Sequence, residues 1–207
     1  MEKEFIESNI VLLGNYNPAT FDKLFFIKNN LIDENLFSDK SVFTPNYCRI
    51  ITENLIISVD SNQILLVTQK VSESILEKCA TSIIEHKGGT KAIGCNFKWY
   101  IFVDEKIENH TKSQFYPINN KFISSEFDTP TSAFGYYASK DFHSSRMKID
   151  IKPIGIKNIN TNEDKSALSF DFNFHIEEIL KSKSISDVFK DYALFKKEVN
   201  KFIESYE

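Results

Sequence analysis

The chain has 207 residues, of which 42% are hydrophobic and 26% charged, and its formal net charge is −4. These values are typical of one globular domain with a sizeable core, and they give no general attraction to nucleic-acid phosphates, so we expect no nucleic-acid partner. No run of eighteen apolar residues occurs, and the opening residues MEKEFIESN lack the features of a signal peptide. We therefore expect a cytoplasmic protein that does not enter a membrane.

The three cysteines, Cys48, Cys79 and Cys95, are odd in number, far apart and set in apolar contexts. None belongs to a CxxC pair or stands at metal-ligand spacing from a histidine. We therefore expect reduced, buried thiols, with no structural disulfide, no bound metal and no other cofactor.

The first third of the chain predicts a strand, a helix and a group of short strands. Asn9–Gly14 is an apolar run ending at glycine, as in a buried strand. Asn17 and Pro18 suit an N-cap and a first helical position, which predicts a helix to about Ile32. Three short apolar segments then predict strands, namely Tyr47–Thr52, Leu55–Val59 and Ile64–Thr68.

A helix followed at once by a long strand is the best-defined local feature. Ser74 and Glu77 have capping-box spacing, and an apolar stripe predicts a helix as far as Lys87. Two glycines then end the helix. In Thr90–Val103 every second residue on one side is apolar, so we expect a central strand with Trp99 largely buried beneath a helix.

The other side of this central strand is partly polar and carries Asn96 and Lys98. A buried asparagine here must be hydrogen-bonded, for example to the turn at Asn15–Asn17. The alternative is a sheet face that is open to solvent or to a partner.

The last third predicts three further strands, Ser132–Ser139, Arg146–Ile156 and Leu168–Phe174, and a long helical stripe over residues 184–206. Residues 104–113 are polar and predict a short surface helix. No internal repeat is visible. We therefore predict one α+β domain over residues 1–207, in two layers: a largely antiparallel sheet with helices on one face and a long C-terminal helix.

Two short motifs carry a resemblance. Leu13–Pro18, LGNYNP, is followed by Phe21, and the later segment 94–97 reads Gly-Cys-Asn-Phe. They resemble a family of uncharacterised bacterial proteins with a GN(F/Y)NPxxF opening and a later strand carrying Gly-x-Asn-aromatic. The resemblance covers the N-terminal half, and Lys87–Thr90 departs from it, because Lys-Gly-Gly-Thr stands where those proteins often have His-Thr-Pro. It implies a bacterial origin and no assigned activity.

One strand offers the only candidate catalytic cluster. Asp171, Asn173 and His175 alternate along its polar side, with Glu178 just beyond. Such a row can hold a cation or a polar ligand, or it can be a solvated strand face. The first reading predicts a small metal-dependent hydrolase of a phosphoester or another small polar substrate, with Asp171, His175 and Glu178 as its catalytic residues.

The end of the C-terminal helix favours a different class of function. Either the whole apolar stripe covers Leu168–Phe174, or Phe202, Ile203 and Tyr206 overhang the sheet and bind a second chain. The absence of a catalytic motif and the many aromatic residues favour a protein-interaction function over a hydrolase. We therefore expect a non-catalytic protein-interaction subunit or adaptor of a bacterial multiprotein system, bound to a protein partner or homo-oligomeric, with antiviral defence as one conceivable context.

Overall fold

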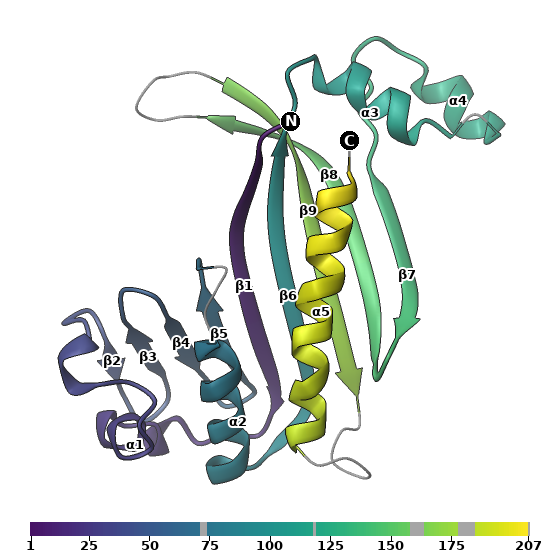
Figure 1. Ribbon diagram of the computed structural model, residues 1–207. Coiled ribbons are helices and arrows are strands. Elements are labelled where there is room, and N and C mark those ends of the chain that lie inside the picture. The colour runs from purple at the N-terminus through teal and green to yellow at the C-terminus, as the bar shows by residue number, and fades with distance from the viewer. Residues whose placement is uncertain (71–73, 118, 158–163, 178–184, 207) are drawn as a thin grey trace.

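The computed structural model describes residues 1–70, 74–117, 119–157, 164–177 and 185–206, and every structural statement below concerns these residues. Within them, nine strands form one antiparallel sheet in the order β2-β3-β4-β5-β1-β6-β9-β8-β7 (Figure 1). The predicted α+β class is therefore confirmed.

The sheet has long strands at its centre and on one side, and short strands on the other side. The long strands are β1 (Lys3–Gly14), β6 (Thr90–Phe102), β8 (Ser145–Lys157) and β9 (Asp164–Glu177). The shorter strands are β2 (Val42–Phe43), β3 (Cys48–Ile51), β4 (Ile56–Val59), β5 (Gln63–Thr68) and β7 (Tyr136–Phe142).

Five α-helices and two 3-10 turns accompany the described strands. They are η1 (Pro18–Thr20), α1 (Lys23–Lys28), η2 (Glu34–Leu36), α2 (Ile75–Lys87), α3 (Ile107–Phe115), α4 (Lys121–Phe127) and α5 (Ile185–Ser205). The single helix expected after Asn17 is wrong, because Asp22 ends the first turn and starts a new helix: its carboxylate accepts a hydrogen bond from the Phe25 amide, with 2.7 Å between the two atoms. Ser74 is the N-cap of α2, but its side chain makes no capping hydrogen bond.

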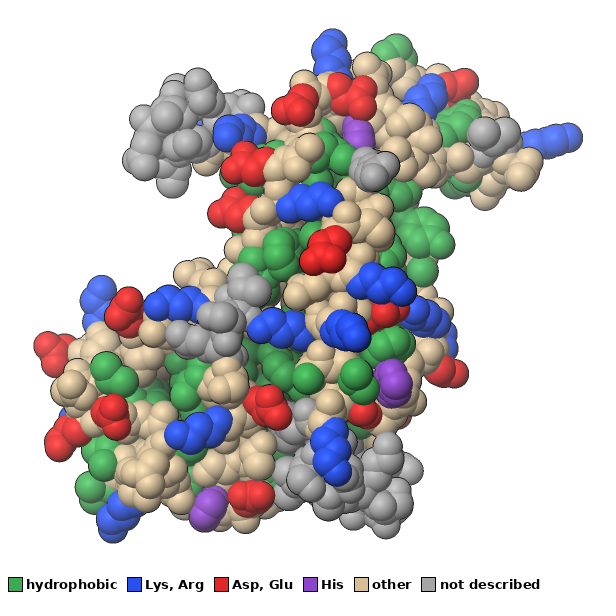
Figure 2. All heavy atoms as spheres, viewed as in Figure 1, with side chains coloured by type: hydrophobic (Ala, Val, Ile, Leu, Met, Phe, Trp, Pro, Cys, Tyr) green, Lys and Arg blue, Asp and Glu red, His purple; other side chains and the backbone are tan. Residues whose placement is uncertain are grey.

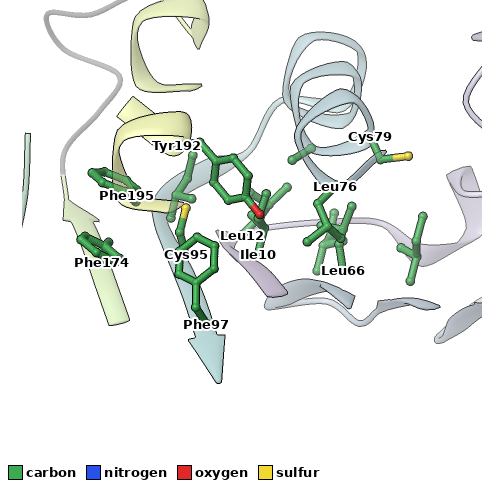
Figure 3. Close-up of a cluster of buried hydrophobic side chains, with 14 of the residues drawn as sticks. Ile10, Leu12, Leu66, Leu76, Cys79, Cys95, Phe97, Phe174, Tyr192 and Phe195 are labelled. Atoms are coloured by element: carbon green, nitrogen blue, oxygen red, sulfur yellow. The ribbon is translucent and has the colours of Figure 1, made fainter. Parts of the chain in front are cut away.

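The core lies where α2 and α5 pack on one face of the sheet (Figure 3). Phe195 of α5 stacks on Phe174 of β9, with 4.4 Å between ring centroids and 10° between ring planes. Tyr192 lies over Phe97 of β6, at 5.6 Å. Because each of these aromatic pairs joins α5 to a different long strand, the helix is fixed along the middle of the sheet.

The sheet topology is repeated, which the sequence does not reveal. β1 leads through α1 to the antiparallel run that ends with β5 beside it, and α2 follows. β6 leads in the same way through α3 and α4 to the run that ends with β9 beside it, and α5 follows. The two halves meet where β1 pairs with β6, in the middle of the sheet.

Trp99 is partly buried and packs against the hydrophobic core. At this level of the sheet Phe202 of α5 and Tyr206, which follows the helix, contact Phe170 of β9, and Trp99 packs edge-on against Phe5 of β1, with 5.3 Å between ring centroids. The indole nitrogen is nevertheless shielded from solvent, and no described residue accepts a hydrogen bond from it.

Trp99→Phe is therefore expected to change the free energy of unfolding by less than about 1 kcal/mol. The smaller ring loses apolar contact, but the variant also removes a buried N–H group whose lack of a partner costs about 1–3 kcal/mol. Urea denaturation followed by circular dichroism measures the change. A loss above about 3 kcal/mol would contradict this account of the indole.

Candidate functional site

The sheet face opposite α2 and α5 carries a shallow depression with a volume of about 380 Å³. Its polar lining comes from five neighbouring strands, β1, β6, β9, β8 and β7, and we call it the polar strip. The polar strip consists of Glu7, Asn9, Asn96, Lys98, Tyr137, Lys148, Asp150, Asp171 and Asn173. These side chains are half-buried or exposed. This answers the question raised by Asn96: its face of the sheet is accessible.

Three asparagines form a hydrogen-bonded ladder across the polar strip. Asn96 donates from Nδ2 to Oδ1 of Asn9, and Asn173 donates from Nδ2 to Oδ1 of Asn96, with 2.6 Å between the atoms of each pair. Asn9 in turn donates to Oε1 of Glu7, at 3.3 Å. Asn96 is therefore satisfied by the neighbouring strands and not by the turn at Asn15–Asn17.

Glu7 lies on this face by ordinary alternation with Asn9, and a β-bulge directly precedes it. Phe5 pairs with Trp99, but the register shifts by one residue before Glu7, which then pairs with Lys98. Without the shift, Phe5 would share the face of Glu7, because side chains two residues apart in a strand do so. The bulge therefore turns Phe5 to the other face of the sheet, where its ring contacts Trp99.

Two ion pairs neutralise most of the charge on this face. The Lys98 ammonium lies 3.3 Å from Oδ1 of Asp171, and the Lys152 ammonium lies 2.6 Å from Oδ2 of Asp150. The two aspartates are direct neighbours on β8 and β9. Like charges placed directly opposite each other are destabilising, so each aspartate is accompanied by its own lysine.

The residues of the proposed hydrolase do not converge. Asp171 and His175 lie on the same face of β9, but four residues apart, which corresponds to about 13 Å along a strand. His175 Nε2 lies 2.9 Å from Oε1 of Glu177, and Glu178 falls outside the described residues. The described residues contain no group of three histidine, cysteine, aspartate or glutamate side chains that could hold a metal.

A second candidate surface lies at the β7 edge of the sheet. A groove of about 220 Å³ opens between β7, β8 and the distal part of α5, and we call it the edge groove. Its lining residues are Tyr136, Ala138, Ser139, Lys140, Met147, Ile149 and Phe202. Hydrophobic side chains reach the surface on the right of Figure 2, where Figure 1 places β7. Tyr136 and Tyr137 are 51% and 62% exposed, which is high for large aromatic residues.

The backbone of β7 is available on its outer side. β7 and β8 form a hairpin whose two-residue turn has His143 at φ 51°, as the primed hairpin turns require at their first central position. Counting back from this turn, Phe142, Lys140 and Ala138 bond to β8, and the residues between them direct their N–H and C=O groups outward. One such carbonyl, that of Ser139, is 3.5 Å from the guanidinium of Arg146.

The predicted partner-binding residues of α5 pack within the chain. Ile203 is 3% exposed and belongs to the core. Phe202 lies 5.6 Å from Phe172, and Tyr206 lies 4.9 Å from Phe170, between ring centroids. The stripe therefore covers β9, as the first of the two sequence alternatives states, and of these three residues only Phe202 lines the edge groove.

Sequence reasoning missed a buried histidine contact at the end of α5. His110 lies 3.0 Å from Oε1 of Glu105 through Nδ1, and 3.1 Å from the Tyr206 hydroxyl through Nε2. Burial raises the pKa of Tyr206 to about 12, so its phenol stays neutral and is not activated as a nucleophile. This contact connects α3 to the C-terminal end of α5.

Neither a protein-family model nor a curated protein matches the chain. None of the helices in the described residues is long and apolar enough to span a membrane.

Proposed function

We propose that the protein is a non-catalytic protein-interaction subunit or adaptor of a cytoplasmic bacterial multiprotein system, and that it binds through β7. The observation that carries the proposal is an exposed edge strand beside an apolar groove. An edge strand offers unpaired N–H and C=O groups to a partner strand, and pockets beside it accept the partner's side chains. A two-layer arrangement, with helices on one face only, is part of the proposal, because it leaves both β7 and the polar strip accessible.

A second copy of the chain suits the β7 edge as partner. If two β7 strands pair antiparallel about Ser139, Tyr136 faces Phe142 and Ala138 faces Lys140. Tyr137 faces Asp141, which the Arg146 guanidinium already binds at 2.8 Å. No like charges oppose each other in this register, and aromatic pairs close both ends, which stabilises antiparallel pairing.

Lys140 does not prevent this pairing. Its ammonium lies 3.0 Å from Oε1 of Glu198 on α5, so the charge points back over the chain's own edge groove. The neighbouring alanine of the second copy then packs beside the methylene stem of the lysine.

Ser139→Pro is expected to abolish self-association while leaving the monomer folded. Proline removes the outward N–H that the second copy needs, and proline is tolerated at edge positions whose N–H faces solvent. Ser139→Ala is the matched control, because it loses the same hydroxyl and keeps the N–H. Light scattering coupled to size exclusion is expected to show dimers for the wild type and for Ser139→Ala, and monomers for Ser139→Pro.

Circular dichroism of Ser139→Pro is expected to match that of the wild type, which separates lost pairing from lost folding. A wild-type monomer at the highest soluble concentration would exclude the second copy as partner. A folded Ser139→Pro dimer would exclude β7 as the interface.

The alternative function, a metal-dependent hydrolase, has less support. It needs Asp171 and His175 at one centre, and β9 holds them about 13 Å apart with Asn173 between them. Asp171 is also engaged by Lys98.

A further inference from the structure

We propose that the polar strip is a binding site for an extended, uncharged oligosaccharide. This inference is independent of the proposed function, because it concerns the opposite face of the sheet from the edge groove and needs no second copy of the chain. Four features carry it: the spacing of the polar groups, their hydrogen-bonding capacity, their charge balance and an exposed aromatic ring at one end.

The polar groups form two parallel rows that cross the strands. One row contains Asn9, Asn96, Asn173 and Lys148, which are register partners on β1, β6, β9 and β8. The other contains Glu7, Lys98, Asp171, Asp150 and Tyr137, and it reaches one strand further, to β7.

The dimensions of these rows suit an extended glycan. Neighbouring strands are about 4.8 Å apart, so polar groups recur at about that interval, and the longer row extends about 19 Å. This interval is close to the length of one pyranose unit in an extended chain. The rows lie two residues apart, or about 7 Å, which leaves room for one chain of sugar rings between them.

The strip offers donors and acceptors in alternation, as sugar hydroxyls require. Each asparagine amide has two N–H groups, and the ladder uses one of them in Asn96 and one in Asn173. One N–H of each therefore remains for a ligand. Carboxylate oxygens of Glu7, Asp150 and Asp171 have acceptor capacity beyond the bonds described above.

The charge balance excludes polyions. The strip has three carboxylates (Glu7, Asp150, Asp171) and two ammonium groups (Lys98, Lys148), and Lys152, which pairs with Asp150, brings the charge of this face to zero. A phosphate backbone needs a strongly positive surface, and a basic peptide needs a strongly negative one. A neutral ligand rich in hydroxyl groups needs no net charge on the surface that binds it.

Tyr137 supplies the apolar contact that sugar rings use. Its side chain is 62% exposed at the end of the longer row, and its register partner is Asp150. The C–H face of a pyranose ring packs on an exposed aromatic ring, while its hydroxyl groups bond to polar neighbours. Tyr137 and Asp150, side by side at the end of the longer row, provide such a ring and such a polar neighbour.

Local rules of sheet construction are broken here three times. Asparagine is depleted in strands, yet three are paired at the centre of the sheet. Asp150 and Asp171 are like charges on directly paired positions. A bulge in β1 directly precedes Glu7, at the edge of the same site. Departures of this kind concentrate at functional sites, because selection for stability alone removes them.

The test is titration of the full chain, labelled with ¹⁵N, with a panel of neutral hexasaccharides: β-1,4-glucan, α-1,4-glucan and β-1,4-linked N-acetylglucosamine. We expect at least one of them to shift the side-chain amide resonances of Asn96 and Asn173 in a saturable way. These resonances report on the ladder directly and are not moved by association through β7.

Two tyrosines make a matched pair of variants. Tyr137→Ala is expected to weaken binding at least tenfold, whereas Tyr136→Ala is expected to leave it unchanged, since Tyr136 is adjacent in sequence, similarly exposed and on the opposite face of the sheet. Asn96→Leu is expected to abolish binding, and heat denaturation verifies that this variant is folded.

No saturable shift with any panel member would overturn the proposal. Equal weakening by both tyrosine variants would overturn it as well, and so would binding of heparin or of a basic peptide at the same resonances in place of the neutral panel. Dimerisation measured by light scattering is a separate result, so failure here leaves the proposed function intact, and the reverse also holds.

Discussion

Phe195→Ala is expected to lower the free energy of unfolding by about 3–5 kcal/mol, which is a large part of the stability of a typical domain. Phe195 is fully buried, stacks on Phe174 and also contacts Phe142, at 6.2 Å between ring centroids. The substitution therefore leaves a cavity at the point where α5 meets both β9 and the β7–β8 hairpin. Neighbouring rings can fill only part of it.

Urea denaturation of the full chain measures this loss, and Phe122→Ala is the control. Phe122 is 71% exposed on α4, so its removal is expected to change stability by less than about 0.5 kcal/mol. Equal stability of wild type and Phe195→Ala would contradict the placement of α5 on the sheet.

Strands with strict alternation could be predicted from the sequence, because one of their faces is buried. Leu168–Phe174 alternates large apolar and polar residues, and the structure places it in β9 with the apolar set under α5. The junction of α2 and β6 was equally predictable, since Gly88 and Gly89 both adopt positive φ between them. The ends of the strands were less predictable. β1 begins at Lys3, well before the predicted strand Asn9–Gly14, and its first residues show no clear alternation of apolar and polar side chains.

The candidate sites depend on pairing between distant strands, which residue spacing does not encode. Asn96 was noted in the sequence as a polar residue on a central strand, but its two partners, Asn9 and Asn173, are 87 and 77 residues away. The bulge before Glu7 is a property of register and leaves no local signal. β7 lies some residues later than the predicted strand Ser132–Ser139, so the sequence did not identify the exposed edge.

Raising the pH above about 9 is expected to destabilise the protein steeply through its three thiols. The burial expected for Cys48, Cys79 and Cys95 is confirmed, since none is more than 1% exposed. Burial raises the pKa of each thiol from 9.0 to about 12. The native state therefore keeps three protons that the unfolded chain releases between these two values.

The direction of the effect follows from the protons bound. Below about pH 8 both states are protonated, and the thiols add no pH dependence. Between pH 9 and about 12 the unfolded state binds fewer protons, so the free energy of unfolding falls by about 1.4 kcal/mol per pH unit for each thiol, or about 4 kcal/mol for three. Because the unfolded thiols are already half ionised at pH 9, the loss from pH 9 to 10.5 reaches about 5 kcal/mol, which is enough to unfold many domains.

Urea midpoints measured from pH 8 to 10.5 test this expectation, and Cys95→Ala provides the internal comparison. Cys95 of β6 is buried beneath α5, beside Tyr192 (Figure 3), so its removal costs some stability at pH 8 but also removes one of the three titrating groups. The slope of stability against pH above pH 9 is expected to fall by about one third in this variant. A wild-type stability that stays flat from pH 8 to 10.5 would show that the thiols are accessible to solvent, and would contradict the burial of Cys48, Cys79 and Cys95.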